Sequence, residues 1–168
     1  MNELFLSPDE EARLTSLKTY KILDTGKEQE YDAVTALAAA VCDAPIALIS
    51  FMDKDRQWFK SHHGTKITQT DKASSFCSYT VVQPDRLMMV EDAKKDERFK
   101  NNPLVTGDPH VIFYAGMPIV NGEGIPLGAL CIIDHKPKML NQHQQSALKS
   151  LAAQVMDKLE LRKKFADR

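Results

Sequence analysis

The side chains best suited to chemistry are three cysteines, Cys42, Cys77 and Cys131. They are widely spaced and form no CxxC pair, so in a chain of 168 residues they indicate neither a zinc site nor a disulfide framework. We expect each thiol to be reduced and to behave as a small buried hydrophobic group. Cys77 and Cys131 would meet only if the segment around Cys77 folded over the strand that holds Cys131, and that arrangement would permit a redox switch.

No other residue pattern indicates a catalytic or metal centre. His62 and His63 are adjacent, so on a strand they point to opposite faces and cannot chelate one ion. The sequence contains no GxGxxG, P-loop, GxSxG or HExxH motif. We therefore predict no metal site and no catalytic residue, and the sequence leaves any cofactor unknown.

The composition argues against polyanionic and membrane partners. The 22 Lys and Arg residues nearly balance the 23 Asp and Glu residues, so no overall field attracts nucleic acid or an anionic membrane. No apolar run approaches the roughly 18 residues of a membrane helix, and the N-terminal segment is acidic, unlike a signal peptide. We predict a cytoplasmic protein that binds neither nucleic acid nor membranes.

Three helices are predicted from their capping patterns. "SPDE" places Ser7 at a cap and Pro8 at the first helical position, and "TGKE" places Thr25 at a second cap with Glu28 three residues later. "NQHQ" places Asn141 at the cap of a C-terminal helix. Its apolar stripe consists of Leu148, Leu151, Val155 and Leu159.

The strand signals lie between these helices. Segments 45–53 and 57–64 are expected to form a hairpin, residues 87–90 a short strand, and residues 113–134 a second hairpin. The fold class is therefore α+β with an antiparallel sheet. The segment from Thr65 to His110 holds only one convincing strand, so we expect it to lie as a lid over one face of the sheet.

Five stretches, in order, carry a resemblance to a known family: "EEARLTSLKTYKILDT", "YDAVTALAAAVCDAPIALISFMDKDRQWFKSHHG", "SSFCSYTV", "VEDAKKDERFKNNPLV" and "FYAGMPIVNGEGIPLGALCIID". Over nearly its whole length the chain resembles the GAF domain family, the small-molecule-sensing modules of cytoplasmic, bacterial-type signalling proteins. The resemblance implies a central antiparallel sheet with N- and C-terminal helices on one face and a ligand pocket under a mixed lid on the other. We predict one domain over 1–168, with a helical arm at 1–24, a core at 25–140 and a C-terminal helix at 141–168.

The resemblance places a ligand-binding site between the sheet and the lid. Trp58 offers a stacking surface, Asp92 caps a short helix near a polar ligand atom, and Cys77 lies near the cavity mouth. Strand alternation leaves open which face of the 113–134 hairpin lines the pocket. The predicted ligand-binding residues are Trp58, Phe76, Cys77, Asp92, Phe113, Ala115, Met117 and Cys131.

The function implied is that of a sensory or regulatory domain, not an enzyme. It would bind an unidentified small molecule and signal through its terminal helices as a homodimer, with a kinase or cyclase as downstream output domain. The sequence leaves open whether the chain stands alone or is cut from a longer protein. Two alternatives remain, a thiol enzyme like the free methionine-(R)-sulfoxide reductases and a dimerisation module without a ligand.

Overall fold

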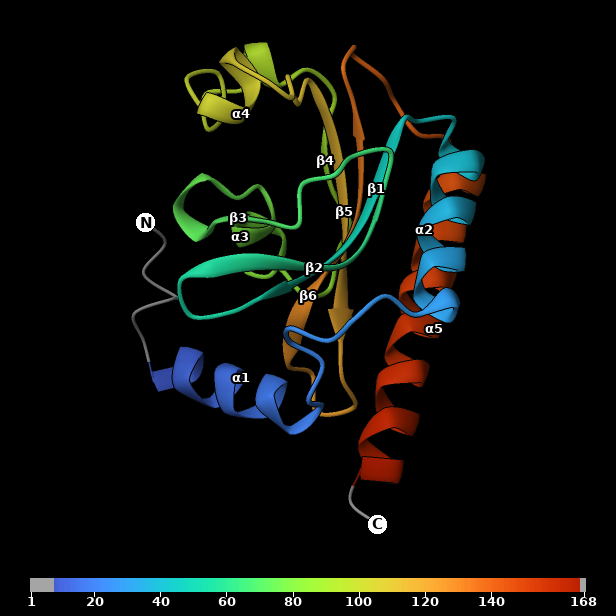
Figure 1. Cartoon of the computed structure of the whole chain (residues 1–168). Helices are drawn as coiled ribbons and strands as arrows, with labels where there is room; N and C mark the ends of the chain where they lie inside the picture. Colours follow the sequence, from blue (N-terminus) through green and yellow to red (C-terminus); the bar gives the residue numbers. More distant parts are fainter. Residues whose placement is uncertain (1–7, 167–168) are drawn as a thin grey trace.

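The computed structural model describes residues 8–166, which form six strands and five α-helices (Figure 1). The predicted cap Ser7 lies outside the described residues. The strands are β1 (Ile46–Met52), β2 (Arg56–His63), β3 (Gln69–Asp71), β4 (Met88–Val90), β5 (Phe113–Val120) and β6 (Pro126–Asp134). The α-helices are α1 (Pro8–Thr19), α2 (Gln29–Cys42), α3 (Cys77–Thr80), α4 (Pro103–Thr106) and α5 (Gln142–Ala166), and two single 3₁₀ turns are η2 (Lys72–Ser74) and η3 (Ala93–Lys95).

The strands form one antiparallel sheet in the order β3-β2-β1-β6-β5-β4. The two predicted hairpins, β1 with β2 and β5 with β6, are confirmed, and β1 and β6 pair to join them at the centre. The short strand β4 is also confirmed, on the outer edge of β5. The sequence prediction missed β3, because its three residues, Gln-Thr-Asp, show no apolar alternation.

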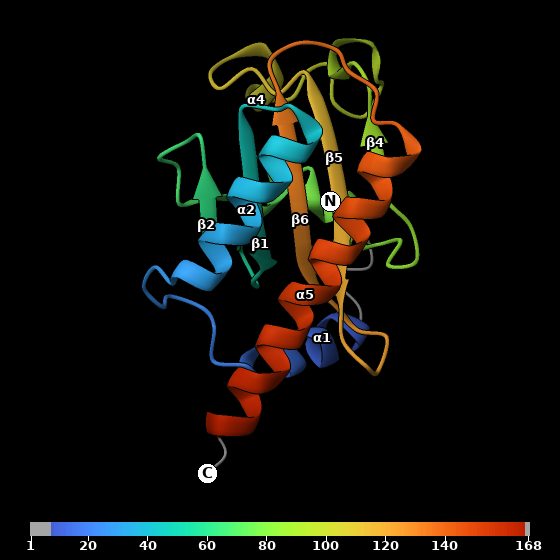
Figure 2. The same cartoon turned by 90° about the vertical axis from the view of Figure 1, so that its right-hand side faces the viewer.

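Two layers cover the sheet. Helices α2 and α5 pack against one face, and the segments between the strands β3 and β5, apart from the edge strand β4, form a lid with α3 and α4 over the other face (Figures 1 and 2). The predicted stripe of α5 is confirmed, since Leu148, Leu151, Val155 and Leu159 are all buried against the sheet. Helix α1 lies across one end of the sheet, where it contacts β6. None of the described helices is long and apolar enough to cross a bilayer.

Of the predicted helix caps within the described residues, Asn141 is confirmed and Thr25 is wrong. At α5 the Asn141 side chain accepts from the backbone N–H of Gln144 at 2.9 Å, and the Gln144 side chain accepts from the backbone N–H of Asn141 at 2.8 Å, as a capping box requires. The predicted cap Thr25 is wrong, because α2 begins only at Gln29. The Thr25 hydroxyl accepts from the buried ammonium of Lys60 at 2.8 Å instead.

Candidate functional site

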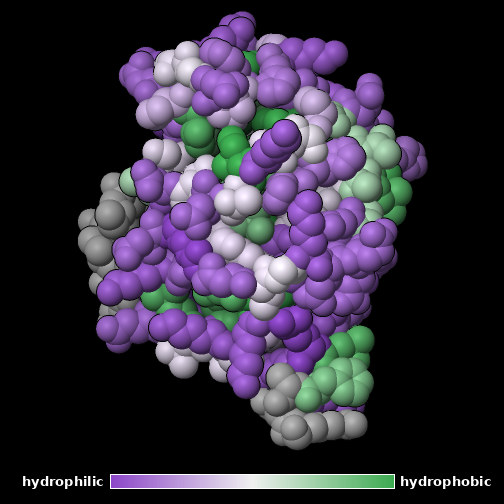
Figure 3. All heavy atoms as spheres, viewed as in Figure 1, coloured by the Kyte–Doolittle hydropathy of each residue, from purple (hydrophilic) through white to green (hydrophobic). Residues whose placement is uncertain are grey.

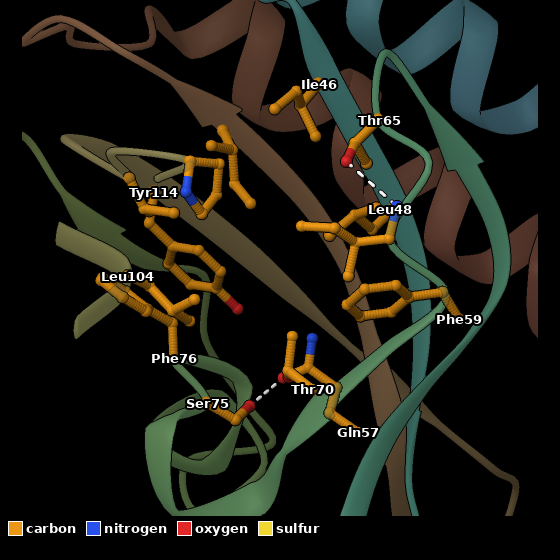
Figure 4. Close-up of a pocket in the computed structure, with 14 residues that line it drawn as sticks. Ile46, Leu48, Gln57, Phe59, Thr65, Thr70, Ser75, Phe76, Leu104 and Tyr114 are labelled. Atoms are coloured by element: carbon orange, nitrogen blue, oxygen red, sulfur yellow. Dashed lines mark hydrogen bonds between the residues drawn. The ribbon is translucent and has the colours of Figure 1, made fainter. Parts of the chain in front are cut away.

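A cavity of about 50 Å³ lies between the sheet and the lid (Figure 4). Strand alternation on β1 and β2 directs Leu48 and Phe59 into it, and they face Phe76 of the lid and Tyr114 of β5. Phe76 stacks on Phe99 with ring centroids 4.1 Å apart, which makes the lid wall an ordered aromatic surface. Most of the lining is therefore aliphatic or aromatic.

The cavity leads into a surface cleft of about 480 Å³. Ile46, Thr65, Ile67 and Pro109 line both spaces, so they form the neck between them. The cleft adds charged and polar side chains, namely Lys66, Asp108 and His135. Figure 3 shows hydrophobic atoms at the bottom of a hollow on this side of the molecule, surrounded by hydrophilic surface. The site thus combines an apolar interior with a polar mouth.

Three polar side chains lie in the floor of the cavity. Ser75 donates a hydrogen bond to the side-chain oxygen of Gln57, which satisfies that pair. The hydroxyl of Thr70, on β3, is buried and is the one side-chain N or O atom within residues 8–166 that is buried with no hydrogen-bond partner. An unpaired buried hydroxyl costs about 1–3 kcal/mol, so its position in a cavity wall indicates a place for a ligand or a water.

A cluster of thiols and hydroxyls lies directly behind Tyr114. The sulfurs of Cys77 and Cys131 are 3.0 Å apart, and the Tyr114 hydroxyl lies 3.0 Å from the Cys77 sulfur. The Ser50 hydroxyl donates to the same sulfur at 3.3 Å. Thr80 lies 2.9 Å from the Tyr114 hydroxyl and fixes its position. All five side chains are completely or almost completely buried.

The groups around Cys77 and Cys131 shift the pKa values of these two thiols in opposite directions. Burial raises the pKa of the Cys77 thiol, but hydrogen bonds from Cys131, Ser50 and Tyr114 outweigh burial and lower it below its ordinary value. Burial and the neighbouring Cys77 raise the pKa of Cys131 well above the ordinary value. Cys42, the last residue of α2, has a pKa raised to about 11 by burial. Cys77 is therefore the thiol of the three that ionises most readily.

Gly116 makes room for the Tyr114 side chain. A Cβ at Gly116 would clash with the Tyr114 hydroxyl and would come within 2.6 Å of the Thr80 hydroxyl. The absent side chain lets the phenol lie along β5 and reach Cys77. Gly116 lies inside β5, so the site and not a turn requires this glycine.

The sequence-predicted site residues divide between the two faces of the sheet. Phe76 lines the cavity, and Cys77 and Cys131 meet behind Tyr114 on the lid side. Four predicted residues require correction: Trp58, Phe113 and Ala115 are buried in the core under the helices, and Met117 packs against that core. Successive side chains along a strand point to opposite faces of the sheet, so the neighbours of these four residues are the ones that reach the lid side.

Two further predictions near the lid have mixed outcomes. Asp92 caps η3, as expected, because its side chain accepts from the backbone N–H of Lys94 at 3.1 Å, but Asp92 is not among the residues that line the cavity. Cys77 does begin the short helix α3, but it is fully buried and does not lie at the cavity mouth. Tyr114 and Thr70 were not predicted as site residues, although a tyrosine within an otherwise apolar strand does indicate a polar function at Tyr114.

A buried ionic group joins the lid to α1. The Glu10 carboxylate accepts from Arg13 at 2.8 Å and from Lys72 at 2.8 Å, and all three residues are at most 9% exposed. Arg13 also donates to the backbone carbonyl of Met52, at the end of β1, at 2.6 Å. Lys72 opens η2, three residues before Ser75 in the cavity floor. The group therefore connects the start of the lid to the N-terminal helix.

A second ionic group joins the sheet to α5. Lys60 lies on β2 next to the cavity residue Phe59, and its ammonium is completely buried. It binds the Glu28 carboxylate at 2.6 Å, and Arg162 of α5 binds the same carboxylate at 3.1 Å. No group of three His, Cys, Asp or Glu side chains capable of holding a metal ion occurs in the described range 8–166.

Comparison with known proteins decides the family. The sequence pattern named "GAF domain" matches residues 27–159. The chain belongs to the GAF domain family. It is 37% identical over 152 residues to a protein named cyclic di-GMP phosphodiesterase from Pseudomonas aeruginosa, covering 90% of this chain and 26% of that protein. The GAF chain thus spans about a quarter of the length of this curated relative.

Solved structures share the fold at low identity. A GAF domain from a phosphoenolpyruvate-protein phosphotransferase of Coxiella burnetii superposes with a TM-score of 0.68 at 13% identity, covering 96% of this chain and 100% of that one. A domain of a two-component sensor histidine kinase protein from Sinorhizobium meliloti gives 0.64 at 15% identity, covering 84% and 97%. These likenesses agree with the α+β architecture predicted from the sequence.

Proposed function

We propose that this GAF domain is a non-enzymatic sensor that binds a small, mostly apolar molecule in the cavity under the lid. The observation that carries the proposal is the unpaired Thr70 hydroxyl in an otherwise aliphatic and aromatic wall. An apolar ligand with one hydrogen-bonding group would bury its surface against Leu48, Phe59 and Phe76 and satisfy this hydroxyl.

The cavity is too small to enclose a ligand of ordinary size. Sites for drug-sized ligands enclose about 300–1,000 Å³, whereas this cavity holds about 50 Å³. A ligand of ordinary size must therefore extend through the neck into the cleft, or it must displace the lid. Displacement is the event that a sensor needs, because a ligand shifts a conformational equilibrium only through different affinities for the two states.

The two ionic groups provide routes from the cavity to the terminal helices. A displacement of the lid at Ser75 would move Lys72, and the ion pair between Lys72 and Glu10 would transmit this displacement to α1. Movement of β2 at Phe59 would act through Lys60 and Glu28 on α5. Both contacts are short and at least partly buried, so they are less screened than exposed pairs.

The output is proposed to lie in another domain or subunit in the cytoplasm. The relative named cyclic di-GMP phosphodiesterase is about four times as long as the matched segment, which supports output through a phosphodiesterase, cyclase or kinase. We also propose a homodimer through the terminal helices. Leu161 on the terminal helix α5 is 54% exposed, and Leu37 on α2, which packs beside α5, is 52% exposed, so this helical layer presents apolar side chains on its outer surface.

The test compares Thr70→Val with Thr68→Val, a matched change at an exposed threonine before β3. Native mass spectrometry of the purified wild type identifies any co-purified molecule, and its dissociation constant is then measured for all three proteins. We expect Thr70→Val to stabilise the ligand-free protein by about 1 kcal/mol, because it removes an unpaired polar atom, and to weaken binding about tenfold. Thr68→Val should change neither quantity. A ligand bound with equal affinity by wild type and Thr70→Val would contradict the proposed site.

A further inference from the structure

The two buried cysteines of the site belong to different layers of the fold. Cys77 begins α3 in the lid, and Cys131 lies on the central strand β6. Their sulfurs, 3.0 Å apart, need to approach by about 1 Å to reach the length of a disulfide bond. Cys42 is equally buried, but it lies on α2 in the core on the other face of the sheet. The fold therefore singles out one pair of its three thiols.

The hydroxyls around this pair favour a reactive thiolate at Cys77. A thiolate sulfur there would accept hydrogen bonds from the Tyr114 hydroxyl at 3.0 Å, from Ser50 at 3.3 Å and from the Cys131 thiol. Hydrogen bonds to the charged form stabilise it, and the thiolate is the nucleophilic form of cysteine. The Cys131 sulfur, 3.0 Å away, lies within reach of an oxidised form of the Cys77 sulfur such as a sulfenic acid.

The cavity provides the approach for a small reagent. The Tyr114 side chain lines the cavity, while its hydroxyl touches the Cys77 sulfur, and the neighbouring residue Phe76 forms the cavity wall. Both sulfurs are 0% exposed and neither lines the cavity, so the Tyr114 or Phe76 side chain must shift before a reagent in the cavity touches Cys77, and the shift is smallest for a small reagent. A hydroperoxide is small enough to enter a cavity that admits only a few water-sized molecules.

We propose that Cys77 and Cys131 form a dithiol pair that a hydroperoxide oxidises to a disulfide between the lid and the sheet. The Cys77 thiolate attacks the peroxide oxygen, the O–O bond breaks, and the leaving oxygen takes up a proton to give an alcohol, or water from hydrogen peroxide. The Cys131 sulfur then attacks the sulfenic acid of Cys77, the S–O bond breaks, and the departing hydroxide takes the Cys131 proton as water. Two thiols lose two electrons and the peroxide gains them.

The disulfide would hold the lid in the closed position. It would join α3 to β6 beside Phe76 and Tyr114, two of the residues that enclose the cavity. A lid fixed to the sheet exchanges cavity contents more slowly than a free lid. The oxidised domain would therefore differ from the reduced domain in its response to any ligand that needs the lid to open.

The test treats the reduced, folded protein with hydrogen peroxide and then blocks the remaining thiols in denaturant. We expect the mass of two hydrogen atoms to be lost and peptide mapping to show a link between Cys77 and Cys131, with Cys42 recovered as the alkylated thiol. Cys42→Ser, the matched control, should form the same link at the same rate. Absence of the link in the folded wild type, or oxidation of Cys42 at a similar rate, would overturn the proposal.

Three variants separate the roles of the groups. Cys131→Ser should stop at a sulfenic acid on Cys77 that dimedone captures, whereas Cys77→Ser should give no dimedone adduct on Cys131. Tyr114→Phe tests the positioning role of the phenol. We expect oxidation about threefold slower in this variant, with the same linked product, because losing one hydrogen bond raises the thiol pKa by roughly one unit, which lowers the thiolate fraction about tenfold but leaves a more nucleophilic sulfur. An unchanged rate in Tyr114→Phe, with the fold intact by circular dichroism, would show that the phenol does not support the reaction.

Discussion

Replacing Glu10 with Gln tests the connection between the lid and α1. The carboxylate is 5% exposed and lies between two cations, with the side-chain nitrogens of Arg13 and Lys72 each 2.8 Å away. Glutamine has nearly the same shape but no charge, so the variant removes the anion that lies between Arg13 and Lys72. Removing one partner of a buried ion pair costs about 3–5 kcal/mol, because the other charge stays buried without compensation.

The lower end of this range applies here. Arg13 also donates to the Met52 carbonyl at 2.6 Å, and Lys72 donates to the Lys54 carbonyl at 3.2 Å, so neither cation loses every acceptor. We expect a loss of about 3 kcal/mol, which for a domain of this size corresponds to a fall in Tm of roughly 6–12 °C. Calorimetry or thermal circular dichroism measures this shift. The control Glu11→Gln, at an exposed position on the same helix, should stay within about 0.5 kcal/mol of wild type.

The pH dependence gives a second check on the same carboxylate. Burial alone would raise the pKa of Glu10, but the hydrogen bonds from Arg13 and Lys72 outweigh burial and hold it below its ordinary value of 4.5. A carboxyl whose pKa is lower in the folded state contributes stability that is fully present above the unfolded pKa and lost as the pH falls through the folded pKa. The difference between wild type and Glu10→Gln should be constant near neutral pH and shrink below about pH 4.5. A Glu10→Gln protein as stable as Glu11→Gln at neutral pH would refute the argument.

Three further predictions concern packing and acidity. Gly116→Ala should lower the unfolding free energy by about 1–3 kcal/mol, measured by urea titration, because its Cβ displaces the Tyr114 phenol. Leu151→Asp should cost more than about 4 kcal/mol by burying a carboxylate in the core under α5, whereas Leu161→Asp, at a 54% exposed site, should leave the fold intact and reduce any dimer seen by sedimentation. Burial raises the pKa of Cys42 from the ordinary value of 9.0 to about 11 in the folded protein. The contribution of this thiol to stability is therefore fully present below pH 9.0 and is lost as the pH rises through about 11. Cys42→Ala should flatten the profile of unfolding free energy against pH between these two values.

The sequence predicted the local structure well because local structure depends on neighbouring residues. The capping box at Asn141 and the two hairpins follow from short patterns that need no knowledge of the rest of the chain. The cap at Thr25 failed because its hydroxyl binds Lys60, a residue 35 positions away. A capping pattern does not indicate that a distant buried ammonium competes for the same oxygen.

The pocket face could not be predicted, because the central strands are buried on both sides. All seven residues of β1 are buried, so its sequence shows no alternation that would separate the helix side from the lid side. Phe113 and Tyr114 are adjacent and both nearly inaccessible, yet one lies under the helices and the other lines the cavity. Only the placement of the lid distinguishes them. The same holds for Thr70, whose role depends on a three-residue strand that the sequence does not indicate.

Tyr114 links the two proposed activities and also allows them to be separated. Its ring forms part of the cavity wall, and its hydroxyl contacts the Cys77 sulfur at 3.0 Å. A ligand that fills the cavity would therefore lie in the path of a peroxide approaching Cys77, and a disulfide between α3 and β6 would in turn restrict the wall that the ligand contacts. By contrast, Thr70 lies in the cavity floor on β3, and no hydrogen bond joins it to the thiols among the described residues. Thr70→Val should thus alter ligand affinity without changing the rate of disulfide formation, whereas Tyr114→Phe should change that rate and leave the Thr70 hydroxyl in place.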